Sequence, residues 1–460
     1  MNQLNLDYAQ LAEWDKAYIW HPFTQMQTWN TADPLIIERG EGCYLIDVLG
    51  NRYLDGTSSL WVTVHGHAHP VLTQAIKDQV DKIAHTTLLG LGNVPSIQLA
   101  KKLVEITPTG LTKVFYSDAG ATSVEIALKI AFQYWHQHND PRQQQKKKFI
   151  SLEAAYHGDT VGTISVGGTG SAYATYRDLL FEGYRVPSPH CYHCPLGQER
   201  DQCNLACVHA VEEIMAEHHQ EIAAMIIEPL VQGAAGMITA PDGYLGKVRE
   251  LCTKYNILMI ADEVAVGFGR TGTLFACEQE GVSPDIMCIA KGLTGGYLPL
   301  AATLTTQEIF KGFLGEPREG KTFFHGHTFT GNPVGCAVAL ANIEVIEQTQ
   351  LIQHIQTSAQ LVRGELEKFK ALSHVGNVRQ RGLMVGIELV RDKVTKEPYT
   401  IEENIGHQVI LEARRQGLII RPLGNVLVLM PILAMSEEQL RQMLSITYQA
   451  IKDVTEREST

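Results

Sequence analysis

Two stretches of the sequence decide the fold: ILMIADE at residues 257–263 and PDIMCIAK at residues 284–291. Each contains a short apolar run that ends in charged side chains. Apolar runs of about four to eight residues favour strands that are buried on both faces rather than helices. Four more short apolar runs occur at residues 113–116, 149–152, 223–227 and 300–304.

Helical patterns lie between these runs. We expect helices over residues 122–138, over 244–255 with Asp242 as the N-cap, and over 334–347 after Asn332-Pro333. Strands that alternate with helices predict an α/β domain with a mostly parallel sheet.

The two ends of the chain have a different pattern. Short β-like pieces near the N-terminus occur at residues 35–38, 43–47 and 51–54. Beyond residue 350 a helical stretch precedes expected strands at residues 384–390, 418–421 and 425–430. We therefore expect a large domain over 76–345 and a smaller α/β lobe, built from an N-terminal segment, 1–75, and a C-terminal domain, 346–460.

Composition narrows the class of protein. The 460 residues include 38 basic and 50 acidic side chains, a net charge of −12, which argues against a nucleic-acid surface. Hydrophobic residues make up 45% and charged residues 19%, which excludes a disordered or collagen-like chain. Residues 1–16 lack the pattern of a signal peptide, and we find no apolar run of membrane-spanning length. We expect a cytoplasmic enzyme that acts on small molecules, with no nucleic-acid or membrane partner.

Polar side chains follow the expected strands at the edge where ligands bind in parallel α/β sheets. Tyr156, Glu228, Asp262 and Lys291 each come shortly after an apolar run, and Glu263 follows Asp262 directly. A tyrosine, carboxylates and a lysine are therefore expected to converge there.

Lys291 is the central residue of this group. Its apolar run buries the start of the side chain, and a desolvated lysine becomes a nucleophile that forms a Schiff base. The alternative is a lysine that reaches solvent at a strand end. Asp262 has the position of an acid that holds the protonated pyridine nitrogen of pyridoxal 5′-phosphate (PLP); the alternative is an N-cap.

Residues 118–122, DAGAT, join a strand to a helix. Free N–H groups and the helix dipole at such a turn suit a phosphate, although many strand–helix turns contain glycine. The turn matches neither GxGxxG nor a Walker loop, which disfavours NAD and ATP. Tyr156 is placed to stack on a flat ring or to be a half-buried core residue.

At these residues the sequence resembles the class III aminotransferases, PLP-dependent transferases of fold type I. The similarity is carried by residues 260–264, 267–272, 284–286 and 290–292, with Glu228-Pro229 and Gly331-Asn332-Pro333. It extends over nearly the whole chain. The resemblance implies a large domain that binds PLP.

The resemblance also implies roles for single residues. Lys291, Asp262 and Tyr156 would be catalytic: Lys291 bonds to PLP and moves the proton, Asp262 pairs with the pyridine nitrogen, and Tyr156 stacks on the ring. The implied cofactor-binding set is Gly120, Ala121, Tyr156, Glu228, Asp262, Val264, Lys291, His327 and Thr328. The implied substrate-binding set is Phe23, Leu60, Trp61, Tyr156, Gly326 and Arg421. Thr328 would reach the phosphate of a neighbouring subunit, which implies a homodimer with shared active sites.

A second group of motifs resembles the branch of this class that acts in biotin biosynthesis. It comprises residues 19–26, IWHPFTQM, residues 156–160, residues 293–296 and Arg421-Pro422. That branch aminates 8-amino-7-oxononanoate to 7,8-diaminononanoate, with adenosylmethionine or lysine as the donor. Phe23 and Leu60 stand where the adenosylmethionine users carry Tyr and Trp, and Val428 where they carry Tyr. These differences favour lysine.

Four cysteines, Cys191, Cys194, Cys203 and Cys207, have end spacings that suit a zinc site. The alternative is a cysteine-rich loop without metal, and we assign no metal ligand. Cys252, Cys288 and Cys336 lie in apolar patterns of core residues.

Other readings of the same residues remain. Another class III ω-aminotransferase that acts on a diamine, a β-amino acid or taurine would share every cofactor residue. A PLP mutase or racemase would release no keto product from the donor. A non-catalytic metal-binding scaffold would have no use for Lys291, Asp262 and Arg421 together.

Overall fold

The computed structural model describes residues 7–168 and 171–456. Its centre is a seven-stranded sheet with the order β4-β12-β11-β10-β7-β5-β6. The strands are β4 (Leu111–Ser117), β12 (Ala301–Thr306), β11 (Ile286–Ile289), β10 (Leu258–Asp262), β7 (Ile222–Ile227), β5 (Lys148–Leu152) and β6 (Tyr184–Val186). Only β12 runs antiparallel to its neighbours in this sheet, so the predicted α/β class with a mostly parallel sheet is confirmed.

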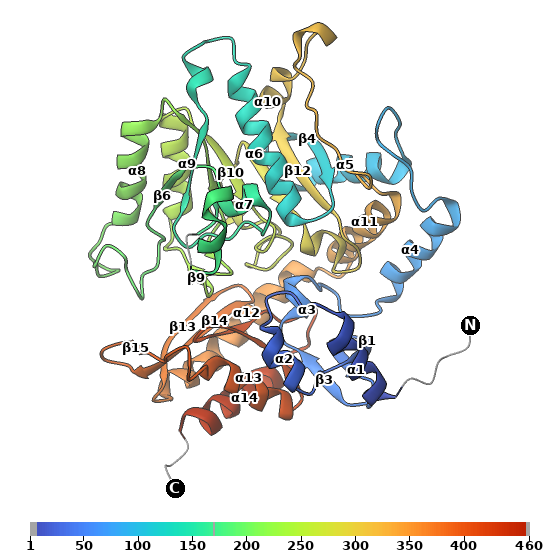
Figure 1. The fold of residues 1–460 in the computed structure, drawn as a ribbon, viewed down its shortest axis with the longest axis vertical. Coiled ribbons are helices and arrows are strands. Elements are labelled where there is room, and N and C mark those ends of the chain that lie inside the picture. The colour runs from blue at the N-terminus through green and yellow to red at the C-terminus, as the bar shows by residue number, and fades with distance from the viewer. Residues whose placement is uncertain (1–6, 169–170, 457–460) are drawn as a thin grey trace.

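Helices pack around this sheet in the upper body of the molecule (Figure 1). They are α4 (Pro70–Lys82), α5 (Val94–Ile106), α6 (Gly120–His136), α7 (Val161–Val166), α8 (Ala206–His218), α9 (Tyr244–Lys254), α10 (Gln307–Gly312) and α11 (Pro333–Gln348). Every residue of β7 and β10 is buried, as expected for strands covered on both faces. A short hairpin, β8 (Val231–Gln232) and β9 (Ile238–Thr239), follows β7.

Both ends of the chain build the lower body, where blue and orange-red segments lie together (Figure 1). From the N-terminal side come α1 (Tyr8–Tyr18), α2 (Met26–Thr31), β1 (Ile37–Glu41), β2 (Tyr44–Asp47), β3 (Arg52–Asp55) and α3 (Ser58–Trp61). From the C-terminal side come α12 (Leu351–Leu366), β13 (Val375–Arg381), β14 (Met384–Asp392), β15 (Glu397–Pro398), α13 (Ile405–Arg415), β16 (Leu418–Ile419), β17 (Arg421–Leu423), β18 (Val426–Leu429) and α14 (Glu437–Thr455).

One strand pair joins the two ends directly. β16 runs parallel to β3, with Leu418 opposite Leu54 and Ile419 opposite Asp55. We therefore propose that residues 1–75 and 346–460 form one lobe, which lies beside the large domain of residues 76–345. The helix α4 crosses the first limit, since it begins at Pro70 and packs on α11.

Two local expectations were wrong. Asp242 does not cap α9: Gly243 occupies the N-cap position with φ of 83°, a left-handed value that favours glycine, and Asp242 instead pairs with Arg381 at 2.7 Å. The run 418–421 is not one strand either, because β16 and β17 belong to different sheets.

None of the helices in the described ranges is both long enough and apolar enough to cross a membrane.

Candidate active site

The side chains expected at the strand ends meet at one edge of the large sheet. Asp262 is the last residue of β10, Lys291 comes just after β11, Glu228 follows β7, and Tyr156 lies beyond β5. All four line one cavity of about 830 Å³. The convergence follows from the fold, because these four strands are parallel neighbours.

Lys291 opens a short 3-10 helix and has a left-handed backbone, with φ of 44°. Non-glycine residues in this conformation are strained, and such strain gathers at functional sites. The Nζ atom lies 4.9 Å from the centroid of the Trp61 ring. Burial lowers the pKa of the ammonium, while the charges of Asp262 and Glu228 oppose that shift. The net effect lowers the pKa of the amine, which is the direction that makes a lysine more nucleophilic.

Asp262 is buried and both of its carboxylate oxygens are engaged. Oδ2 lies 2.7 Å from His157 Nδ1, and Oδ1 accepts a hydrogen bond of 3.0 Å from the Val264 N–H. The other ring nitrogen of His157, Nε2, is buried without a partner among the described residues. His157 therefore fixes the orientation of Asp262. His157 was not assigned a role from the sequence, although it directly follows Tyr156 beyond the end of β5.

Two buried glutamates near these residues have different surroundings. Glu228 lines the cavity and accepts hydrogen bonds from the Tyr156 and Gly233 N–H groups, at 3.1 and 3.0 Å. Burial raises its pKa to about 7, and Asp262 adds to that shift. Glu263 instead accepts from the backbone N–H groups of Ala276 and Cys277 and is not a cavity residue. Of the two, only Glu228 is placed to act on a ligand.

The N-terminus of α6 opens onto the cavity through Gly120 and Ala121. A Cβ on Gly120 would lie 2.5 Å from Val264 Cγ1, so a larger residue would force the turn and the segment after β10 apart. The first-turn N–H groups of a helix lack partners within the helix, and its dipole favours negative charge. The turn therefore suits a phosphate group.

The lobe contributes four expected residues to the lining of the cavity: Phe23, Leu60, Trp61 and Arg421. The Arg421 guanidinium carbon lies 5.9 Å from the centroid of the Phe23 ring. Trp61 is buried, whereas Phe23 and Leu60 are largely exposed. A cationic side chain and aromatic surfaces thus face the lysine side of the cavity.

Asp159, Tyr173 and Tyr297 are further cavity residues that were not predicted. Asp159 accepts hydrogen bonds from the hydroxyls of Tyr156, at 2.7 Å, and Tyr173, at 3.1 Å, and Asp159 and Tyr173 both line the cavity. Tyr297 lines it from the segment after Lys291. Asp159 follows Tyr156 closely enough to be noticed, whereas no sequence signal marks the tyrosines.

Some predicted residues lie outside the cavity of their own chain. Gly326, His327 and Thr328 are not among its lining residues. His327 touches its wall, since Nδ1 lies 2.7 Å from Oδ2 of Asp118, a lining residue. Val428, which stands where the adenosylmethionine users carry a tyrosine, is fully buried opposite Arg421 in the β17–β18 pair and does not line the cavity.

The four clustered cysteines are half-buried: Cys191, Cys194 and Cys203 lie in the segment that leads into α8, and Cys207 lies in the first turn of that helix. Burial raises the pKa of the Cys207 thiol to about 11, and its neighbours Cys191 and Cys203 add to that shift. The described residues contain no group of three or more His, Cys, Asp or Glu side chains arranged to hold a metal ion.

Comparison with known proteins identifies the family. The model of the family described as "Aminotransferase class-III" matches residues 26–451. This chain belongs to the class III aminotransferases. The cofactor of this class III aminotransferase is PLP, and its predicted fold, PLP fold type I, is confirmed.

Individual relatives are similar over almost their whole length. A Geobacter sulfurreducens protein named adenosylmethionine-8-amino-7-oxononanoate aminotransferase is 51% identical over 450 residues, which cover 98% of this chain and 99% of that protein. The crystal structure of the enzyme of that name from Methanocaldococcus jannaschii has a TM-score of 0.93 at 48% identity, covering 97% of this chain and 100% of that one. An ω-transaminase from Pseudomonas jessenii in complex with PMP has a TM-score of 0.92 at 35% identity, covering 97% and 98%.

The residues of this class III aminotransferase fit PLP. An amine with a lowered pKa, a buried carboxylate held by His157, and the N-terminus of a helix border the same cavity. They match the aldehyde, the pyridine nitrogen and the phosphate of the cofactor.

Proposed function

We propose that this aminotransferase converts 8-amino-7-oxononanoate to 7,8-diaminononanoate in biotin biosynthesis. The observation that carries the proposal is one cavity lined by Lys291 and Asp262 of the large domain and by Arg421 and Phe23 of the lobe. An amine and a guanidinium in one cavity suit a keto substrate that also carries a carboxylate. The names of relatives about half identical to the chain support the same substrate.

PLP supplies an electron sink that stabilises the carbanion formed when a C–H bond next to nitrogen is broken. The protein's task is to bind, orient and move protons. Lys291 Nζ, whose pKa is lowered by burial, would carry the proton between the substrate carbon and the cofactor. Asp262 keeps the pyridine nitrogen protonated, since His157 holds the carboxylate in place. Gly120 and Ala121 offer backbone N–H groups to the phosphate.

Arg421 is the proposed partner of the substrate carboxylate. A guanidinium binds a carboxylate through two parallel hydrogen bonds, which fixes orientation as well as position. Tyr156, Trp61 and Phe23 supply flat surfaces, Tyr156 toward the cofactor ring and the other two toward the aliphatic chain of the substrate. Leu60 adds apolar surface at the rim.

The active unit is proposed to be a cytoplasmic homodimer. Gly326, His327 and Thr328 lie outside the cavity of their own chain, which supports a role at the cavity of a partner subunit. Thr328 would then complete the phosphate site that Gly120 and Ala121 begin.

The proposed amino donor is lysine. Phe23 offers no hydroxyl, and Leu60 beside Trp61 offers no second indole, so an adenosyl group would find fewer stacking and polar partners. The relatives' names include adenosylmethionine, which is the competing donor.

Half-reactions separate these alternatives. The enzyme loaded with PLP is mixed with free lysine or with adenosylmethionine. The visible absorbance of the cofactor bound to Lys291 is followed. We expect lysine to bleach it; bleaching by adenosylmethionine and not by lysine would overturn the choice of donor without touching the keto substrate.

A further inference from the structure

The segment that carries Trp61 has an unusual backbone. Ser58, Ser59 and Trp61 have φ values of 51°, 61° and 63°, all left-handed and none of them glycine. Short runs of such residues persist only where surrounding contacts hold them in place. The segment lies in α3, which is kinked at Ser59 and Leu60.

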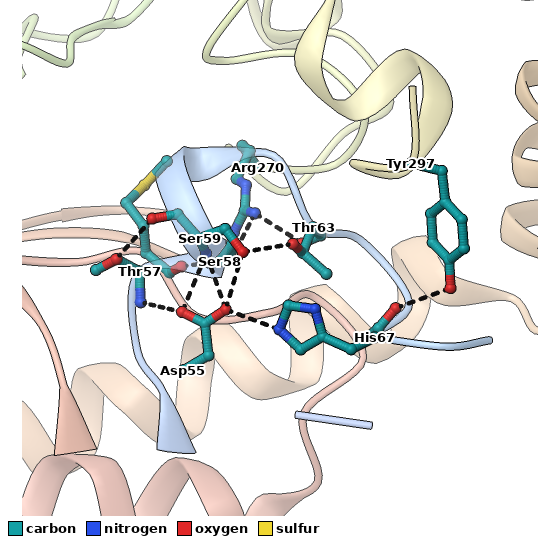
Figure 2. Close-up of polar contacts among 10 residues, drawn as sticks. Asp55, Thr57, Ser58, Ser59, Thr63, His67, Arg270 and Tyr297 are labelled. Atoms are coloured by element: carbon teal, nitrogen blue, oxygen red, sulfur yellow. Dashed lines mark hydrogen bonds and ion pairs between the residues drawn. The ribbon is translucent and has the colours of Figure 1, made fainter. Parts of the chain in front are cut away.

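Asp55 provides the contacts on one side. Its carboxylate is fully buried and accepts from the Thr57 N–H at 3.2 Å and from the Ser59 N–H at 2.8 Å. His67 Nε2 lies 3.0 Å from Asp55 Oδ2. Figure 2 shows the carboxylate below the loop, with dashed lines fanning to the loop and to the imidazole.

Arg270 holds the segment from the other side. Its fully buried guanidinium donates to Ser58 Oγ at 2.8 Å and to the Thr63 carbonyl at 3.1 Å (Figure 2). Ser58 Oγ in turn donates to the Met430 carbonyl at 2.6 Å. The strained loop is therefore clamped between the lobe and the large domain.

The backbone at and next to His67 makes further contacts, one of them with a cavity residue. Its backbone pairs with Gly42 through hydrogen bonds of 2.7 and 3.2 Å. The Tyr297 hydroxyl donates to the neighbouring Gly66 carbonyl at 3.3 Å, and Tyr297 lines the cavity. Asp55 and His67 themselves do not line it.

We propose that Asp55, oriented by His67, is a positioning residue that fixes Trp61 over the amine of Lys291. The clamp holds the strained backbone of residues 57–61, and the indole accordingly stands 4.9 Å from Lys291 Nζ. The inference rests on the proposed role of Trp61 as a wall of the substrate cavity. Asp55 acts on the reaction only through Trp61.

A double-mutant cycle tests this dependence. We measure kcat and KM of Asp55→Ala, Trp61→Ala and the double variant with 8-amino-7-oxononanoate. Asp55→Ala is expected to lower kcat/KM by about tenfold or more, because small misplacements near the reacting atoms are costly. In the Trp61→Ala background the same change should have an effect of less than about twofold.

Asp47→Ala is the matched control. Asp47 is also a buried aspartate in the same sheet, and it accepts from the Leu49 and Asn51 N–H groups at 3.0 and 2.8 Å. It does not line the cavity. We expect this variant to lose stability and to keep kcat/KM.

A readout on the cofactor-free protein is independent of activity. The contribution of Trp61 to the near-ultraviolet circular dichroism is the difference between the parent and Trp61→Ala. Asp55→Ala should lose that contribution and Asp47→Ala should keep it. If Asp55→Ala fails to fold, His67→Phe and His67→Gln replace it. His67→Phe should lower kcat/KM. His67→Gln should keep kcat/KM close to the parental value, because an amide can donate to Asp55.

These measurements separate a failure of the positioning role of Asp55 from a failure of the proposed role of Trp61. Full multiplicative losses from Asp55→Ala and Trp61→Ala, or an unchanged Trp61 signal in Asp55→Ala, would overturn the positioning role. No loss of kcat/KM in Trp61→Ala alone would instead refute the proposed substrate wall, and the inference with it.

Discussion

Lys291 combines a strained backbone, burial and two nearby carboxylates, and these features together make its amine reactive. Lys291→Ala removes the only group proposed both to bond to the cofactor and to move the proton. We expect turnover, measured by product formation, to disappear. The visible absorbance of the cofactor bound to Lys291, measured after incubation with PLP, should disappear as well.

Lys146 is the control for that variant. It is buried, its Nζ donates to the carbonyls of His219 and Asn256 at 2.8 and 2.7 Å, and burial lowers its pKa to about 8. Lys146→Met should lose stability but keep the absorbance and the turnover. Intact turnover in Lys291→Ala would refute the assignment.

Gly120 permits the close approach of the phosphate turn to Val264. Gly120→Ala places a Cβ about 2.5 Å from Val264 Cγ1 and should weaken PLP binding by about tenfold or more. Gly364→Ala, in α12, meets no heavy atom within 4 Å and should leave PLP affinity unchanged. Equilibrium titration of the cofactor-free protein compares the two; equal affinities would contradict a phosphate site at this turn.

At the level of elements, β10 ends in Asp262 and is followed by Glu263, which serves stability. Burial raises the pKa of the Glu263 carboxyl from 4.5 to about 7. The folded protein therefore binds a proton more tightly than the unfolded chain, so the stabilisation is complete below pH 4.5 and is lost as the pH rises to about 7.

Glu263→Gln should flatten this dependence while lowering the overall stability, because one backbone N–H loses its acceptor. Between pH 4.5 and 7 the parent should lose about 3 kcal/mol of unfolding free energy through Glu263, and the variant should not show this loss. Glu228, whose pKa is raised in the same direction, leaves a residual slope. Urea unfolding of the cofactor-free protein at several pH values measures the effect, and parallel curves for parent and variant would contradict it.

The strands of the large sheet were predictable because burial on both faces leaves an apolar run with a polar residue at its end. β6 was missed, since its three residues, Tyr184–Val186, include an arginine and give no such run. The α9 N-cap was misplaced by one residue because the left-handed Gly243 could not be distinguished from an aspartate cap. In both cases the structure depends on tertiary contacts that the local sequence does not reveal.

Some residues of the candidate site were likewise predictable from the sequence and others were not. Asp262, Lys291, Glu228 and Tyr156 were found from the strand-end rule alone. Phe23 and Arg421 came only from family resemblance, because nothing local indicates that a distant lobe folds over the sheet edge. Tyr173 and Tyr297 were missed because they reach the cavity from irregular segments whose path depends on packing.

At the scale of the whole molecule, the proposed dimer makes each active site depend on two chains. In a mixed dimer of one Lys291→Ala chain and one Thr328→Ala chain, both changes should fall in the same active site and leave the other site intact. Co-expression should therefore restore about a quarter of the parental activity, since half of randomly assembled dimers are mixed and each has one intact site. Activity is measured on the co-expressed mixture, and no recovery above that of the two variants expressed separately would contradict a shared site.

The central claim is tested most directly by the second half-reaction. The enzyme carrying the aminated cofactor, freed of donor, is mixed with 8-amino-7-oxononanoate, and mass spectrometry follows the product while absorbance follows the cofactor. We predict one equivalent of 7,8-diaminononanoate per active site, with return of the visible absorbance. Absence of this product, with return of the absorbance on addition of a different keto or aldehyde compound, would contradict the account.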